Sequence, residues 1–160
     1  MIDLQQFCAN THDPRDYLRE PFQLGACVYA TNGHIAVRIP RDEAPHVKPN
    51  DRAPKHIEVL FGTAHDGGIG EFIPMPELPI DRVCSECQGK GTQDYGDGDE
   101  KCWQCNGLGF QTVQQDINDA AFNVHYLNML AALPNARIRT NGESVMAAVL
   151  FDGGQALLMP

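Results

Sequence analysis

The chain has 160 residues, of which 42% are hydrophobic and 21% charged, a composition typical of a globular domain. Its formal net charge of -9 argues against a broad basic surface of the kind that coats DNA, although it leaves room for a local basic strip. No apolar run reaches the roughly 20 residues that span a bilayer, and the N-terminus lacks the basic start and apolar core of a secretory signal. We therefore expect a cytoplasmic protein with no membrane partner.

Residues 1–39 are predicted to form a short helix followed by a β-hairpin. Three apolar residues near the start stand at i, i+3 and i+4, which is the spacing of one helix face: Leu4, Phe7 and Cys8. Asn32 and Gly33 then separate two apolar runs, and Asn-Gly is the strongest short hairpin signal because both residues tolerate positive φ. We therefore expect strands over 26–31 and 34–39.

Residues 40–83 read as a proline-rich connection. Seven prolines interrupt residues 40–79, and the glycines of residues 67–70 add further breaks. Only residues 56–62, HIEVLFG, have the character of a short strand or a helical turn. We therefore expect a loop-rich segment that leads to a cluster of cysteines.

Residues 111–160 are predicted to form one helix and three short strands. An apolar stripe at helical spacing runs through residues 119–133, with Asp119 as the expected N-cap and Pro134 as the end. The stripe consists of Phe122, Tyr126, Met129, Leu130 and Leu133. Turn sequences at 141–142 and 152–154 then divide the remaining residues into strands.

The two ends of the chain resemble each other, because each has a helix followed by a hairpin. The triplet Thr-Asn-Gly occurs at 31–33 and again at 140–142, although Asn-Gly is common enough in hairpins for a chance match. We predict an α+β fold of two helix-plus-strands half-domains, residues 1–39 and 111–160, with an insertion between them. The predicted core residues are Phe7, Val28, Ile35, Val37, Phe122, Leu127, Leu130, Ile138, Val149 and Leu157.

Residues 84–110 contain two Cys-x-x-Cys pairs with the spacing C-x2-C-x14-C-x2-C. The four residues are Cys84, Cys87, Cys102 and Cys105. Zn²⁺ takes four thiolates tetrahedrally in structural sites, and in a reducing compartment paired knuckles indicate metal before disulfides or a redox dithiol. Four thiolates leave zinc no open position, so we expect one structural zinc ion that takes no part in catalysis.

Spaced glycines follow each cysteine pair and are expected to let the backbone turn sharply toward the thiolates. They are Gly89, Gly91, Gly107 and Gly109. The loop between the pairs carries four acidic residues, Asp94, Asp97, Asp99 and Glu100. We interpret them as a solvated hairpin tip, since the spacing of an EF-hand calcium loop is missing. Trp103, Lys90 and Lys101 are candidate contacts for a partner, although for Trp103 we favour packing over the metal site.

The repeats CSECQGKG and CWQCNGLG resemble the CxxCxGxG repeats in the cysteine-rich region of DnaJ-type cochaperones. That region has four repeats that hold two zinc ions, whereas this chain has two, which implies one zinc knuckle pair over residues 84–110. No His-Pro-Asp motif of a J-domain accompanies the repeats, and residues 11–14, THDP, have a different order. The resemblance therefore does not imply cochaperone activity.

Two further stretches resemble the bacterial DNA polymerase III sliding clamp. Residues 120–160 match that family's helix start and chain ending at Phe122, Asn123, Val124, Tyr126, Leu127, Leu158, Met159 and Pro160. Residues 17–39 match its hairpin at Ala30, Thr31, Gly33, His34 and Ala36. The resemblance implies a DNA-clamp-like domain that carries the zinc-binding β-hairpin module as an insertion. The bacterial clamp chain has three such domains, so a ring would need several copies of this chain.

Ring clamps hold DNA through Lys and Arg side chains on the helices that line the hole. The predicted helix over 120–133 has neither residue, and the early segment offers little beyond Arg15 and Arg19. The departure from the family pattern therefore weakens the expectation that this chain encircles DNA.

No catalytic or nucleotide-binding motif appears in the sequence. The pairs His12-Asp13 and His65-Asp66 are interpreted as surface loop residues, so we expect no enzymatic activity. We predict a zinc-binding, sliding-clamp-related protein that binds a protein partner in DNA replication or processing, with homo-oligomers as a further expectation. The alternatives are a chaperone-like adaptor whose zinc knuckle binds polypeptide, and a nucleic-acid binder that uses Lys90, Lys101 and Trp103.

Overall fold

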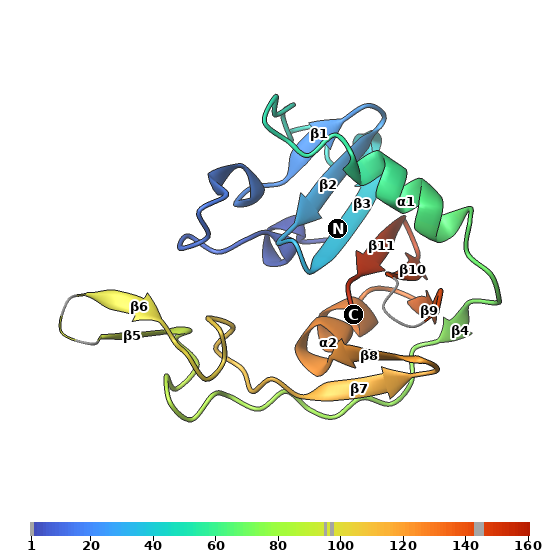
Figure 1. The fold of residues 1–160 in the computed structure, drawn as a ribbon. Helices are drawn as coiled ribbons and strands as arrows, with labels where there is room; N and C mark the ends of the chain where they lie inside the picture. The colour runs from blue at the N-terminus through green and yellow to red at the C-terminus, as the bar shows by residue number, and fades with distance from the viewer. Residues whose placement is uncertain (1, 95, 97, 143–145) are drawn as a thin grey trace.

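A seven-stranded antiparallel sheet forms the body of the molecule, and the tetracysteine module, residues 84–110, projects from it (Figure 1). The computed structural model describes residues 2–94, 96, 98–142 and 146–160. The strands lie in the order β1 (Phe22–Leu24), β2 (Cys27–Thr31), β3 (Ile35–Pro40), β11 (Gly154–Leu158), β10 (Ala147–Phe151), β9 (Arg137–Arg139) and β4 (Ile73–Pro74). Because β3 pairs with β11, the two ends of the chain share one continuous sheet.

The N-terminal hairpin forms as predicted. Strands β2 and β3 pair antiparallel, with Ala30 opposite Val37. The Thr31 hydroxyl accepts a hydrogen bond from the Gly33 N–H at 3.1 Å and donates one to the Ile35 carbonyl at 2.7 Å. Gly33 has φ +91°, a conformation that glycine adopts without strain. The turn chemistry of this segment therefore sets the register of the hairpin.

One face of the sheet is covered by α1 (Ile57–His65), which the sequence indicated only as a short strand or helical turn. Ile57, Phe61 and Ala64 are buried, and their i, i+4, i+7 spacing makes one apolar helix face against the sheet. Prolines stand on both sides of the helix and none lies within it. Their number made the whole of residues 40–83 read as a loop, which concealed the helical spacing. Residues 40–83 thus contribute a layer of the fold and do more than connect its parts.

The opposite face is covered by α2 (Val124–Ala131) and by a 3-10 turn, η1 (Leu4–Phe7). The predicted helix start at Asp119 is wrong, because residues 120–123 are extended and the N-cap is Asn123. Its side chain accepts a hydrogen bond from the His125 N–H at 2.9 Å. Asn118, at φ +51°, turns the chain between two strands that precede the helix. They are β7 (Gln114–Ile117) and β8 (Ala120–Asn123).

Two clusters of buried side chains occupy the two faces, as strand alternation requires. All ten predicted core residues are buried. Nine of them lie in the cluster beneath α2 and η1, and Leu157 lies in the cluster beneath α1. The arrangement confirms an α+β fold. The helical segments of both predicted half-domains pack on the same face, although the first is a single 3-10 turn.

The remaining elements are short. They are the 3-10 turns η2 (Asp16–Leu18) and η3 (Arg41–Glu43), and the two strands of the module hairpin, β5 (Thr92–Asp94) and β6 (Asp99–Lys101). Among the described residues, neither α-helix has the length and apolar run that crossing a membrane would require.

Candidate metal centre

Four buried thiols converge in the module. The Sγ atoms of Cys84 and Cys102 are 4.0 Å apart, those of Cys87 and Cys105 are 3.7 Å apart, and all four lie within 4.8 Å of one another. Zn–S bonds of 2.3 Å in a tetrahedron place sulfur atoms about 3.8 Å apart, so the cluster has the dimensions of a tetrathiolate site. A disulfide would need about 2.05 Å, and all four cysteines are free.

The two knuckles hold each other through a reciprocal pair of backbone hydrogen bonds. The Cys84 N–H donates to the Gly109 carbonyl at 2.9 Å, and the Cys102 N–H donates to the Gly91 carbonyl at 2.8 Å. Each bond runs from the first cysteine of one repeat to the last glycine of the other. The two CxxCxGxG repeats are therefore related by an approximate two-fold arrangement, which explains why their residue patterns are alike.

The predicted knuckle glycines all adopt positive φ. They are Gly89 (+86°), Gly91 (+75°), Gly107 (+85°) and Gly109 (+78°). The N–H groups of Gly91 and Gly109 donate to the Cys87 and Cys105 sulfurs at 3.3 and 3.2 Å. A Cβ on Gly91 would lie 2.5 Å from the Gly107 carbonyl oxygen. All four glycines thus adopt the conformation of a sharp turn, and Gly91 and Gly109 bring their N–H groups to the sulfurs. The structure adds that the two repeats pack backbone to backbone.

The surroundings shift the pKa values of two of the four thiols in opposite directions. Burial raises the pKa of the Cys87 thiol, but hydrogen bonds from the Gly91 N–H and from the Cys105 and Cys84 thiols outweigh it, and the pKa falls to about 7. In Cys105 burial prevails and raises the pKa to about 11. One sulfur is thus partly ionised near neutral pH, and a soft cation that binds all four would displace the remaining protons.

The residues predicted to contact a partner lie on the outside of this module. Trp103 is 72% exposed, so the interpretation that it packs over the metal site is wrong. Lys90 and Lys101 are exposed as well, and the hydrocarbon stem of Lys101 lies against Gly107. A residue between two ligands can point outward because the ligands themselves fill the interior.

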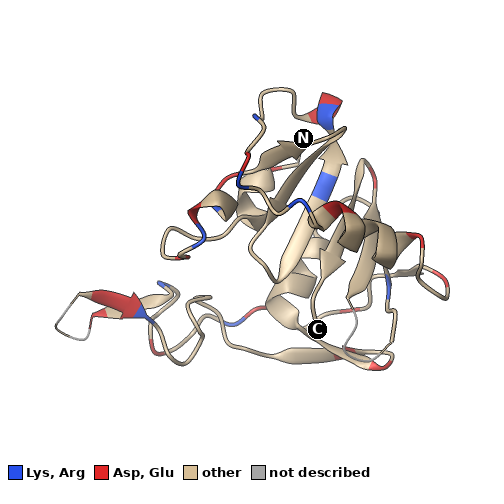
Figure 2. Ribbon diagram, turned by 45° about the horizontal axis from the view of Figure 1, so that its top comes forward, with Lys and Arg blue, Asp and Glu red and all other residues tan. Residues whose placement is uncertain are grey.

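Three of the four predicted acidic residues lie on the β5–β6 hairpin at the far end of the module, as expected (Figure 2). Asp94 and Asp99 are paired across the hairpin and exposed, and Glu100 is exposed beside them. Asp97 lies outside the described residues. The Gly96 N–H donates to the Asp94 carboxylate at 2.8 Å, which closes a local turn. This end of the module is a solvated tip.

One histidine pair differs from the sequence interpretation. His65 is buried in the last turn of α1, whereas a surface loop was expected. Its Nε2 atom lies 3.1 Å from the Ala156 carbonyl, and its ring is stacked between Phe61 and Phe72. His12 is exposed, as predicted. The ring of His65 packs within the body, and among the described residues no nucleophile or carboxylate lies at hydrogen-bonding distance, so its contacts are those of a core residue.

A pocket that sequence reasoning missed lies between α1, the β2–β3 turn and the end of β11. It has a volume of about 300 Å³ and a mainly apolar wall. Its apolar lining includes Ile57, Leu60, Met146, Leu157 and Met159. Arg15 and His34 also line the pocket and contribute polar groups. The signal that could have found it was the helical spacing of residues 57–64.

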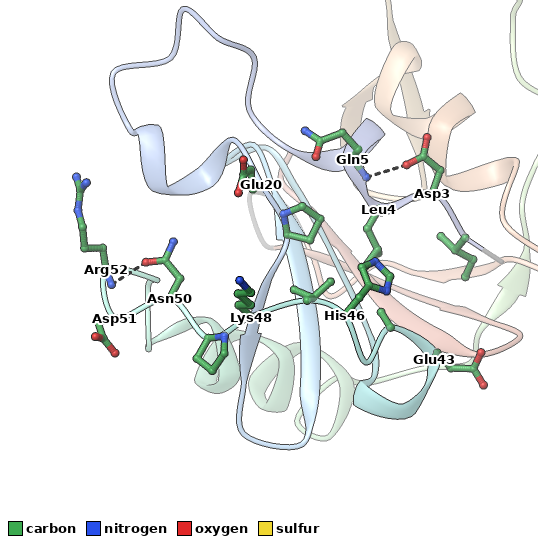
Figure 3. A pocket seen from close by; sticks show the side chains of 15 residues that line it. Asp3, Leu4, Gln5, Glu20, Glu43, His46, Lys48, Asn50, Asp51 and Arg52 are labelled. Atoms are coloured by element: carbon green, nitrogen blue, oxygen red, sulfur yellow. Dashed lines mark hydrogen bonds between the residues drawn. The ribbon is translucent and has the colours of Figure 1, made fainter.

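A second hollow, of about 1090 Å³, lies between the N-terminal turn and residues 43–52 (Figure 3). Side chains of both charges border it, among them Glu20, Glu43 and Lys48. Four acidic residues and two basic ones are mixed along the lining, which favours no one class of ligand, and we assign no function to this hollow.

Among the described residues, four buried cysteines thus form a group that could hold a metal ion, and an apolar pocket is lined by residues from both 17–39 and 120–160. Comparison of the chain with family models, with curated proteins and with solved structures finds no match.

Proposed function

We propose that this chain is a non-enzymatic, zinc-binding relative of the sliding clamp that binds an apolar segment of a protein partner in DNA replication or processing. The observation that carries the proposal is a convergence at the 300 Å³ pocket. Thr31, Gly33, His34 and Ala36 carry the resemblance in the first stretch and Met159 carries it in the second. All five line the same pocket, although residues 40–119 separate the two stretches.

The lining of the pocket suits a short apolar segment. Its volume is at the lower end of the range for ligand pockets, which is enough for a few side chains. Met146 and Met159 are flexible and polarisable, so they can adapt to apolar side chains of different shapes. The Arg15 guanidinium can donate hydrogen bonds to carbonyl or carboxylate groups of the segment, and the His34 ring can donate or accept one, which would fix the direction of the segment.

The four cysteines support a structural role for one Zn²⁺ ion. Thiolate sulfur is a donor that Zn²⁺ favours, and the buried cluster has the dimensions of its tetrahedral site. When bound, the ion would fold the module and hold the exposed Trp103 on a rigid base, where it can contact the same partner outside the pocket.

A matched pair of substitutions on α1 tests the pocket. Leu60 lines it, whereas the neighbouring Val59 is 67% exposed and does not. Wild type, Leu60→Asp and Val59→Asp would be used as baits in native lysate, with captured proteins identified by mass spectrometry. We expect replication or DNA-processing proteins with wild type and Val59→Asp, and their loss with Leu60→Asp. Equal capture by all three baits would contradict the proposal.

The exposure of Trp103 favours one second candidate, an adaptor whose zinc knuckle binds polypeptide. In that case Trp103→Ala would abolish capture and Leu60→Asp would not. A nucleic-acid role for Lys90, Lys101 and Trp103 predicts that the protein retards the mobility of DNA at low salt. The acidic residues at the tip of the module would repel the phosphates and so oppose such binding.

Light scattering decides whether the wild-type chain is a monomer or a homo-oligomer.

A further inference from the structure

Four aromatic rings form a continuous series of contacts between the tetracysteine module and the apolar pocket. The rings of Phe110 and His125 are stacked with centroids 4.4 Å apart, and those of His125 and Tyr126 are 5.5 Å apart. Tyr126 in turn is stacked on His34 at 5.4 Å. Phe110 closes the module and His34 lines the pocket, so the series joins the two sites that the proposed function uses.

The first ring is positioned by the metal cluster. Phe110 follows Gly109, whose carbonyl accepts the hydrogen bond from the N–H of the ligand Cys84, and Phe110 forms a β-bridge with Val83. Among the described residues, the buried interior of the module consists of the four cysteines, with Leu108 packed against them. Such an interior is too small to hold its shape by hydrophobic burial, so the order of this segment depends on the bound ion.

The neck of the module, residues 79–83, is fastened to the first turns of α2. The Asp81 carboxylate lies 3.0 Å from Nδ1 of His125. Asn128 donates hydrogen bonds to the Pro79 carbonyl at 2.9 Å and to the Asp81 carboxylate at 3.2 Å. His125 is therefore held from two sides, by a carboxylate that precedes the cysteines and by a ring that follows them.

The far end of the series reaches the rim of the pocket. His34 is an exposed residue in the β2–β3 turn, and its ring rests on the buried Tyr126 at an interplanar angle of 16°. Tyr126 follows His125 directly on α2, so a change in the position of the His125 ring is transmitted to the surface on which His34 rests. The alternative path, through the main sheet, would require the rigid core to move.

We propose that this stack is a regulatory device that couples the metal state of the tetracysteine module to the shape of the pocket. With metal bound, Phe110 and Asp81 hold His125, and through Tyr126 they hold His34 at the pocket rim. Without metal, the neck is released and His34 loses its fixed orientation. The inference rests on the proposed function for what the pocket binds, whereas the coupling itself can be observed without any partner.

Methyl NMR of methionine-labelled full-length chain tests the coupling. Met159 and Met146 line the pocket, and Met75 packs against the main core outside the pocket lining and serves as an internal reference. We expect the two pocket methyl resonances to move when a chelator removes zinc from the wild-type chain, while that of Met75 stays in place. In His125→Leu the same movement should be at least about fivefold smaller.

Because coupling is reciprocal, a change at the pocket rim must also be felt at the metal. We expect His34→Ala to weaken zinc retention about fivefold in a chelator competition. The matched control is His46→Ala, which replaces an exposed histidine outside the stack and should leave retention unchanged. Since His34 is exposed, this variant folds even if His125→Leu does not.

Any of three results would overturn the inference. The first is that zinc removal leaves the Met159 and Met146 resonances of wild type unmoved. The second is that these resonances move equally in His125→Leu. The third is that His34→Ala retains zinc as well as His46→Ala does. If the methyl resonances respond as expected while Leu60→Asp captures the same partners as wild type, the proposed function fails and the coupling stands.

Discussion

The seven-stranded body and the tetracysteine module are stabilised by different means. The body buries large side chains on both faces of its sheet, including Phe7, Phe61 and Leu130. The module buries four cysteines, against which the half-buried Leu108 packs. The body can therefore fold by hydrophobic burial, whereas the module needs an ion to supply most of its folding free energy. Substitutions in one region should leave the other region folded, and outside the aromatic series that joins the module to the pocket they should not alter it.

The largest effect is expected from Cys102→Ser. Structural zinc sites contribute about 10 to 16 kcal/mol of apparent binding free energy, and loss of one thiolate removes most of it. We expect metal analysis to show loss of zinc, and amide NMR to show an unfolded module beside a folded body.

The control for this variant is Cys27→Ser, which replaces a partly buried cysteine of β2 outside the cluster. It should keep its zinc. Wild-type zinc content in Cys102→Ser would refute the metal site, and unfolding of the whole chain would refute the independence of the body.

Phe61→Ala is expected to produce the opposite pattern. Phe61 is fully buried, meets Tyr29 edge to face at 5.7 Å and lies beneath the guanidinium of Arg38. Truncation of such a residue costs about 3 to 5 kcal/mol, because a cavity remains under α1. Urea unfolding should show this loss while zinc content stays at wild type. Val59→Ala, at an exposed position of the same helix, should change stability by less than about 0.5 kcal/mol.

The sequence was most informative where local chemistry dictates the structure. Cysteine spacing identified four residues that the structure brings together, and Asn32-Gly33 identified the hairpin, because a tetrathiolate group and a tight turn require particular residue types. The same reasoning found all ten core residues. It could not show that the knuckle glycines of one repeat lie against the other repeat, since that contact depends on how the repeats fold together.

The sequence was least informative where tertiary contacts override a local pattern. Residues 120–123 continue the apolar spacing of α2, yet they form β8 because β7 is available to pair with them. The helix α1 was hidden by the prolines around it, and the pocket was therefore hidden too, because Ile57 and Leu60 form its wall. The exposure of Trp103 could not be read from its place between two ligands.

A smaller effect, confined to the module, is expected from Gly109→Ala. At φ +78° a side chain is strained by about 1 to 2 kcal/mol, and its Cβ would also collide with the carbonyl of Gly89. Gly96→Ala is the matched control, because Gly96 has φ +98° with nothing within 4 Å of the added Cβ. We expect Gly109→Ala to weaken zinc retention in a chelator competition, and Gly96→Ala to leave it unchanged. Equal retention by the two variants would mean that the packing of one repeat on the other is unimportant.

The smallest effect concerns pH, and it distinguishes the regions because it arises in the body. Burial lowers the pKa of His65 below 6.5, and the guanidinium groups of Arg38 and Arg139 lower it further. The hydrogen bond with the Ala156 carbonyl raises this pKa but does not outweigh the burial. Nδ1 of His65 has no hydrogen-bond partner within the described part of the chain, so a second proton there would be unpaired. The unfolded chain therefore binds this proton more readily than the folded one.

The sign of the pH effect follows from that difference in proton binding. Above pH 6.5 both states hold His65 neutral and its contribution is constant, whereas below pH 6.5 protonation favours the unfolded state and stability falls. At pH 5.5 the loss is at most about 1.4 kcal/mol for one group. Urea unfolding of wild type and His65→Gln at pH 7.5 and 5.5 measures it, since glutamine does not titrate. The difference isolates His65 from the thiols and from His34, whose pKa is also lowered by burial. An equal loss of stability in both proteins would mean that the pH dependence arises outside the α1 face and that the buried ring of His65 contributes nothing to it.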